Sequence, residues 1–205
     1  MDARIQMSGA YYVAPPAVLR LLFVDDDPIL REFAVVHLSS ETMSVETAQD
    51  GVDGLEAVAA QQPDVVLLDL EMPRADGFEV LRQLRADPAT ARLPVVVATG
   101  REDIAAIDRA FEAGATTFVT KPLNWRLLSY QVRYVHRAHC NETYLLEERR
   151  RMIDRATQAT SALKAVAQES SSFLGTALRA QPDLRGPAQR YADVVAAASG
   201  LLGEG

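Results

Sequence analysis

Short runs of consecutive apolar residues, separated by segments with helical spacing, are the feature that most constrains the fold of this chain of 205 residues. Runs that are apolar at every position are typical of strands covered on both faces of a sheet. They occur at residues 19–24, 65–68, 95–98 and, more briefly, 118–119, while residues 43–47 alternate in polarity as an edge strand would. The sequence therefore predicts five strands, one of them at an edge.

Helical spacing of apolar residues appears between these strands, in residues 29–38, 52–60, 78–85 and 104–113. Asp27 can cap the first helix, and Pro28 suits its first position, where a missing amide costs nothing. Because strand and helix alternate, right-handed βαβ units are expected. We predict an α/β fold with a doubly wound, mostly parallel sheet and helices on both of its faces.

Composition limits the class of protein further. Hydrophobic residues make up 48% of the chain and charged residues 24%, which is ordinary for a globular protein and excludes global disorder. The one cysteine, Cys140, cannot form an intramolecular disulfide, so a cytoplasmic location is expected. No apolar stretch approaches the ~18 residues of a membrane span, and the start of the chain lacks the pattern of a signal peptide.

Charge is distributed unevenly along the chain. Residues 1–125 carry 10 Lys+Arg and 20 Asp+Glu, a net charge of −10, whereas residues 126–205 carry 11 and 8, a net charge of +3. A nucleic-acid-binding core would present a basic face instead of this acidic one. We therefore expect no nucleic-acid partner.

Polar side chains follow the apolar runs at the point where each strand ends. Asp25, Asp26 and Asp27 follow the first run, and Asp69, Thr99 and Lys121 follow three others. Because ligands bind at the carboxyl ends of the strands in such sheets, we expect these groups to converge there. Lys121 is one of only two lysines among 21 basic residues, which indicates that a compact ammonium is needed at this position.

Three carboxylates brought together repel one another, and each pair at about 4 Å costs on the order of 4 kcal/mol at an effective dielectric constant of 20. A hard cation removes that cost, and carboxylates with a carbonyl and several waters are the ligands that Mg²⁺ favours. Asp69 would then be a nucleophile beside a metal, able to form an acyl phosphate. Lys121 and Thr99 would contact the phosphoryl oxygens.

The motifs FVDDDP, DLEMPRADGFEVL, VVVATG and FVTKP occur in an order and spacing that resembles the receiver domain of bacterial two-component response regulators, from about residue 18 to 139. The resemblance implies a flavodoxin-like sheet with strand order 2-1-3-4-5. It also implies that a histidine kinase or phosphotransfer protein is the phosphodonor. The site roles that it implies are phosphoacceptor for Asp69, direct Mg²⁺ ligand for Asp26, second acidic residue for Asp25, carbonyl ligand for Glu71, phosphate contact for Lys121 and conformational switch for Thr99 and Phe118.

The remaining residues, 140–205, are expected to form a helical extension, with residues 1–17 as an N-terminal tail or arm. We predict a long helix from Asn124 toward Phe173, in which Leu145, Met152, Ala159, Val166 and Phe173 share one heptad position. Breaks near residues 181–187 precede a second apolar stripe, Tyr191 to Leu202. No GGDEF, HD-GYP or convincing helix-turn-helix motif follows the receiver. The extension is therefore expected to form a homodimer or to dock an unknown partner, without a DNA-binding domain.

Other interpretations of the sequence stay open. The chain could be an adaptor or phosphate sink without output from its tail, or the receiver part of a longer effector enzyme. A haloacid-dehalogenase-like hydrolase also uses an aspartyl nucleophile, but it expects a second aspartate where this chain has Glu71. Apart from its own phosphotransfer and dephosphorylation, we expect no enzymatic activity. We interpret His136 and His139, on the long helix, as surface or interface residues.

Overall fold

A computed structural model describes residues 5–7, 10–12, 18–72, 76–100 and 104–180, together with 186, 190, 191, 193 and 194. The chain divides into two compact units, Met1–Tyr144 and Leu145–Gly205. The first contains a five-stranded sheet and the candidate site, and the second consists of helical residues where it is described.

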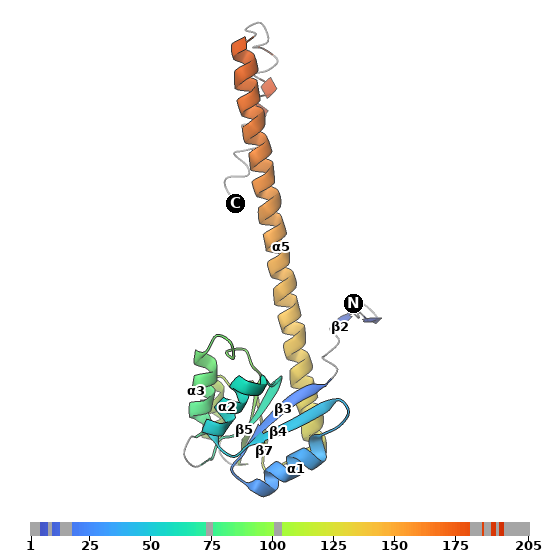
Figure 1. Cartoon of the computed structure of the whole chain (residues 1–205), viewed down its shortest axis with the longest axis vertical. Coiled ribbons are helices and arrows are strands. Elements are labelled where there is room, and N and C mark those ends of the chain that lie inside the picture. Colours follow the sequence, from blue (N-terminus) through green and yellow to red (C-terminus); the bar gives the residue numbers. More distant parts are fainter. Residues whose placement is uncertain are drawn as a thin grey trace. The chain divides into compact units, whose positions relative to one another are not determined.

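All five strands of the sheet are parallel, in the order β4-β3-β5-β6-β7. They are β3 (Leu19–Val24), β4 (Met43–Ala48), β5 (Val65–Asp69), β6 (Val95–Thr99) and β7 (Thr117–Thr120) (Figure 1). Counted along the chain, this is the order 2-1-3-4-5, so the predicted flavodoxin-like sheet is confirmed. The segment predicted to be an edge strand, β4, does lie at an edge.

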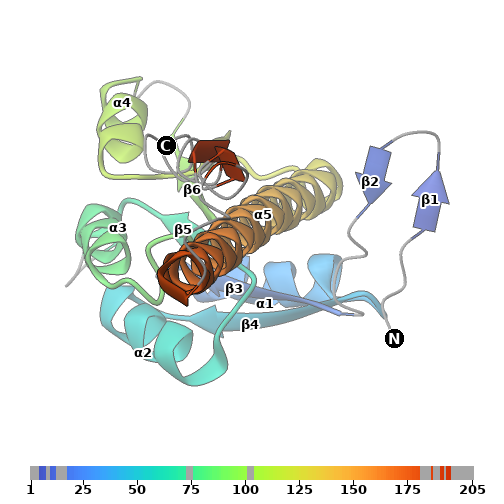
Figure 2. The same cartoon turned by 90° about the horizontal axis from the view of Figure 1, so that it is seen from above.

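Helices cover both faces of the sheet, as the continuous apolar runs predicted. They are α1 (Pro28–Leu38), α2 (Gly51–Gln61), α3 (Gly77–Ala86), α4 (Ile104–Glu112) and α5 (Trp125–Ala180) (Figure 2). One core layer packs Leu22, Val66 and Val97 against α2, α3 and α4. The other packs Phe23, Leu67 and Val96 against α1 and α5. Because successive strand residues point to opposite faces, β3, β5 and β6 each supply residues to both layers.

The strand register brings the polar residues together at one edge of the sheet. Val24 pairs with Leu68, Asp69 with Ala98, and Thr99 with Thr120. The residues that follow these pairs, among them Asp25 and Lys121, therefore leave the sheet at the same end, where its parallel strands finish. Asp69 and Thr99 are themselves the last residues of their strands, one position further than the predicted ends.

The last helix, α5, is 56 residues long and continues seven residues past the predicted end at Phe173. The predicted break at residues 181–187 lies mostly outside the described residues, but Tyr191 lines a cleft of about 570 Å³ with Val166 and Phe173. Part of the chain that follows α5 therefore lies beside it. At the other end, β1 (Ile5–Met7) pairs with β2 (Ala10–Tyr12) in an antiparallel hairpin. Among the described residues no helix is long and apolar enough to cross a membrane.

Candidate functional site

Three carboxylates form the core of the candidate site. Asp25, Asp26 and Asp69 each place a carboxylate oxygen within 4.8 Å of the others, at the carboxyl ends of β3 and β5. Asp25 and Asp69 are buried, whereas Asp26 is exposed. The carboxylates that were predicted to converge at the strand ends therefore do so, and one of the three, that of Asp26, is open to solvent.

Lys121 joins the two buried carboxylates. Its ammonium donates to Asp69 Oδ2 at 2.7 Å and to Asp25 Oδ2 at 3.0 Å. The residue follows β7, where its backbone N–H donates to the carbonyl of Thr99 at 2.8 Å, and the Lys121–Pro122 peptide bond is cis. A side chain 52 positions from Asp69 in the sequence thus balances two charges that the fold has removed from water.

Burial and charge oppose each other at these groups. Burial raises the pKa of Asp69, the hydrogen bond from Lys121 lowers it, and the neighbouring Asp25 raises it, so that the pKa of Asp69 lies above its ordinary value. Burial alone would lower the pKa of Lys121, but the hydrogen bonds to Asp69 and Asp25 outweigh it, and the pKa is raised. The site therefore stabilises the positive charge of Lys121 and disfavours the ionised form of the Asp69 carboxyl group.

Local hydrogen bonds shape the loop between β3 and α1. The N–H of Asp27 donates to Asp25 Oδ1 at 2.9 Å, and Asp27 Oδ1 accepts from the N–H of Ile29 at 2.8 Å as the predicted N-cap. The guanidinium of Arg31 donates to the backbone carbonyl of Asp25 at 2.6 Å. Arg31 was missed by the sequence analysis, although its position one turn into a helix that begins at the site was a usable signal.

The phosphoacceptor candidate is held from its own loop as well. The N–H of Glu71 donates to Asp69 Oδ1 at 3.3 Å. Gly77, the first residue of α3, lies against the backbone of Asp69 and Leu70, so closely that a β-carbon there would overlap both residues. Since backbone atoms cannot move aside as a flexible side chain does, only glycine fits at this position. The glycine of the DGFEVL motif is thus a packing partner of Asp69.

Thr99 and Phe118 occupy the strands on the far side of Asp69. Thr99 is buried at the end of β6, and its Oγ1 has no hydrogen-bond partner among the described residues. An unpaired buried hydroxyl costs free energy unless a ligand completes it. Phe118 is partly exposed and contacts Phe111 of α4 edge to face, with ring centroids 6.1 Å apart.

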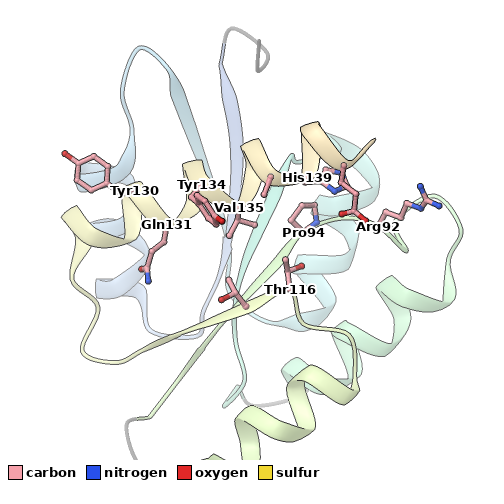
Figure 3. Close-up of a pocket in the computed structure, with 11 residues that line it drawn as sticks. Arg92, Pro94, Thr116, Tyr130, Gln131, Tyr134, Val135 and His139 are labelled. Atoms are coloured by element: carbon pink, nitrogen blue, oxygen red, sulfur yellow. The ribbon is translucent and has the colours of Figure 1, made fainter. Parts of the chain in front are cut away.

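A cleft of about 650 Å³ lies elsewhere on the same unit, between α5 and the residues that begin β6 and β7 (Figure 3). Tyr134, Val135 and His139 line it from the helix, and Arg92, Pro94 and Thr116 line it from the opposite side (Figure 3). None of the carboxylates of the site contributes to it. The strand ends that form the cleft are the amino ends, opposite to those that carry Asp25 and Asp69.

One sequence interpretation is wrong. His136, expected at the surface or an interface, is 4% exposed, and its Nε2 lies 3.4 Å from Cys140 Sγ. Burial lowers the pKa of His136 more than the negative charge of Asp64 raises it. The helical pattern alone could not show this. Val132 and Val135 mark the buried face of the helix, but their spacing does not tell whether that face also includes position 136.

The donor set fits a magnesium ion. Carboxylate oxygens within 4.8 Å of one another, one of them exposed, can bind a hard cation and leave positions for water or phosphate. The ammonium of Lys121 donates to Asp25 and Asp69, and the exposed carboxylate of Asp26 remains accessible to a metal ion. The acidic pocket is thus suited to Mg²⁺ on the chemistry of its own residues.

Comparisons with known proteins identify the family of the domain that carries this site. Residues 21–133 match the response regulator receiver domain family. The chain is 44% identical over 104 residues to the response regulator MprA of Mycobacterium sp. strain KMS, which covers 51% of this chain and 44% of that protein. It is 35% identical over 114 residues to the DNA-binding dual master transcriptional regulator RpaA of Synechocystis sp., covering 56% and 47%.

The fold has solved counterparts too. The chemotaxis protein CheY4 of Vibrio cholerae superposes with a TM-score of 0.55 at 28% identity, over 58% of this chain and 99% of that structure. The chain spans about half the length of the curated relatives that it matches. The match favours a receiver over the haloacid-dehalogenase interpretation. Because residues 21–133, more than half of this chain, match its model, the chain belongs to the response regulator receiver domain family.

Proposed function

We propose that Asp69 accepts a phosphoryl group from a histidine kinase or phosphotransfer protein. The observation that carries this proposal is the position of Asp69 at the end of β5, where Lys121 holds one carboxylate oxygen at 2.7 Å beside two further aspartates. An oxygen of Asp69 attacks the phosphorus, and the phosphorus–nitrogen bond of the donor phosphohistidine breaks. The imidazole leaves with the bonding electrons and takes up a proton, and an acyl phosphate remains on Asp69.

Mg²⁺ is the proposed cofactor, held by the carboxylates of Asp25, Asp26 and Asp69 and by the backbone carbonyl of Glu71. When bound, it supplies compensation for the negative charge of the carboxylates and of the transferred group. Lys121 contributes a second positive charge, already in contact with Asp69. Beyond this transfer and the loss of its own phosphate, the receiver is proposed to have no enzymatic activity.

Thr99 and Phe118 are the proposed switch. A phosphoryl oxygen on Asp69 would give Thr99 Oγ1 the hydrogen-bond partner that it lacks among the described residues. Movement of Thr99 toward the phosphate opens space on its other side, which the partly exposed Phe118 can occupy. Phe118 has no hydroxyl, so it signals through burial alone.

The helical extension is the proposed output, through homodimerisation. Seven large apolar side chains of α5 in the second unit are exposed: Leu145, Leu146, Met152, Ile153, Leu163, Val166 and Phe173. A standard protein interface buries about 800 Å² on each partner, and exposed large apolar side chains are the kind of surface that such an interface covers. We therefore propose that a second copy of the chain covers these side chains. The protein is proposed to act in the cytoplasm, without a membrane span and without a nucleic-acid partner.

Two alternatives to this output are distinguished by their readouts. If the extension docks another protein, the chain should be a monomer whose apolar side chains on α5 stay exposed. If the chain is a phosphate sink, phosphorylation should not change its state of assembly. The relative RpaA is named as DNA-binding, but the match covers 47% of its length. DNA binding by this chain in a gel-shift titration would contradict the proposal of a protein-only output.

The phosphoacceptor is tested with a small phosphodonor and Mg²⁺. The parent is expected to gain one hydroxylamine-sensitive phosphoryl group. Asp69→Asn is expected to gain none, because its neutral amide lacks the carboxylate oxygen that attacks the phosphorus. Asp26→Asn serves as the comparison and is expected to slow phosphorylation by weakening Mg²⁺ binding. An acyl phosphate that persists in Asp69→Asn would move the site to another residue.

A further inference from the structure

The loop that carries Asp25 and Asp26 must place two carboxylates beside a third before any cation arrives. At separations within 4.8 Å these groups repel one another, and a free loop would relax by turning Asp26 away. The side chain of Asp25 is fixed by Lys121 and by the N–H of Asp27. The described structure gives the side chain of Asp26 no such partner, so its direction depends on the backbone that carries it.

Arg31 holds that backbone. Its own N–H donates to the carbonyl of Asp27 at 3.1 Å in the first turn of α1, and its Nη1 donates to the carbonyl of Asp25 at 2.6 Å. The carbonyl of Asp25 belongs to the peptide plane that leads directly into Asp26. Since a peptide unit is planar, fixing this oxygen also fixes the direction in which the chain enters Asp26.

We propose that Arg31 is a positioning residue, which orients the peptide between Asp25 and Asp26 so that Asp26 faces Asp69 and the metal site is formed in advance. The proposal rests on the proposed Mg²⁺-dependent phosphorylation of Asp69. A guanidinium suits the role because it is always charged and offers several fixed donors. A charge-assisted hydrogen bond to a carbonyl is also stronger than a neutral one. Arg31 is half-buried at the edge of the site.

The test compares Arg31→Ala and Arg31→Lys with the parent, and uses Arg126→Ala, an exposed arginine of α5, as the control. Mg²⁺ affinity is measured by titration calorimetry on the unphosphorylated protein. Arg31→Ala is expected to bind Mg²⁺ about tenfold more weakly, which corresponds to about 1.4 kcal/mol. Arg31→Lys, with one mobile ammonium, is expected to recover part of this loss, and Arg126→Ala should match the parent.

Two further readouts separate positioning from a general structural role. In EDTA, amide exchange at Asp26 and Asp27 is expected to accelerate in Arg31→Ala, while exchange in β5 and β6 stays unchanged. With a small phosphodonor, the Mg²⁺ concentration for half-maximal rate should rise about tenfold, and the rate at saturating Mg²⁺ should stay within threefold. Fast exchange throughout the sheet would indicate general destabilisation and overturn the assignment.

Unchanged Mg²⁺ affinity in Arg31→Ala would also overturn it, as would a loss confined to the rate at saturating Mg²⁺. Arg31→Lys that binds Mg²⁺ no better than Arg31→Ala would contradict the role of a donor to the Asp25 carbonyl. Failure of the proposed function itself would be seen in the parent protein and not in the Arg31 variants. In that case the parent would show no Mg²⁺-dependent phosphorylation of Asp69, whatever the Arg31 variants do.

Discussion

Replacing Lys121 with methionine removes the positive charge that contacts both buried carboxylates while keeping a side chain of similar length. At an effective dielectric constant of 20, a carboxylate pair at the upper limit of 4.8 Å repels by about 3.5 kcal/mol, so three such pairs cost at least about 10 kcal/mol. The contacts of Lys121 at 2.7 and 3.0 Å offset about 12 kcal/mol on the same scale. The cluster is therefore close to balance only while the ammonium is present.

The net loss is smaller than the full repulsion, because the carboxylates can protonate and water can enter. Removing one partner of a buried pair typically costs about 3–5 kcal/mol, and the Lys121 side chain is only 28% exposed. We expect Lys121→Met to lose about 3–5 kcal/mol in its free energy of unfolding at pH 8 in EDTA. Millimolar Mg²⁺ should restore most of this loss, because the cation takes over the compensation.

Urea unfolding followed by the fluorescence of Trp125, the only tryptophan, measures this loss. Trp125 packs against Phe23 with ring centroids 6.4 Å apart, so its emission reports on the sheet and not on the distal part of α5. Lys164→Met, at the exposed second lysine, is the matched control and should leave stability unchanged. A Lys121→Met variant within about 1 kcal/mol of the parent at pH 8 in EDTA would refute the charge balance derived above.

Four further outcomes follow from the same structure. Gly77→Ala should cost about 2 kcal/mol or more and slow phosphorylation, measured by urea unfolding and phosphodonor kinetics, because the new β-carbon meets rigid backbone at Asp69. The pKa of Asp69 is raised in the folded state, so its contribution to stability is present below its unfolded pKa and is lost as pH rises through the folded pKa. Asp69→Asn should abolish this fall in the free energy of unfolding with rising pH, as measured by unfolding titrations. Because burial lowers the pKa of His136, its contribution is present above about pH 6.5 and lost as pH falls through the lower folded pKa, so His136→Gln should flatten stability below pH 6.5. If the proposed homodimer forms through α5, Met152→Glu combined with Val166→Glu should convert it to monomers in light scattering, and an unchanged mass would place the interface elsewhere.

Much of the fold could be predicted from the sequence because the relevant signals are local. Runs that are apolar at every position indicate strands buried on both faces, and parallel strands all end on the same side of the sheet. Asp25, Asp69, Thr99 and Lys121 could therefore be grouped from the sequence alone. The residues that cap the helices also lie next to them in the sequence, as Asp27 does at the start of α1. These features depend on neighbours within a few positions, which the sequence displays directly.

Only the tertiary structure decided how the grouped residues divide their roles. It placed the ammonium of Lys121 between Asp69 and Asp25, left Asp26 exposed, and set Gly77 against the backbone of Asp69. It also buried His136, which we had expected at the surface or at an interface. Each of these depends on distances between segments remote in sequence, set by how strands and helices pack. Periodicity determines which face of an element is apolar, but packing determines which polar groups meet and how far each is removed from water.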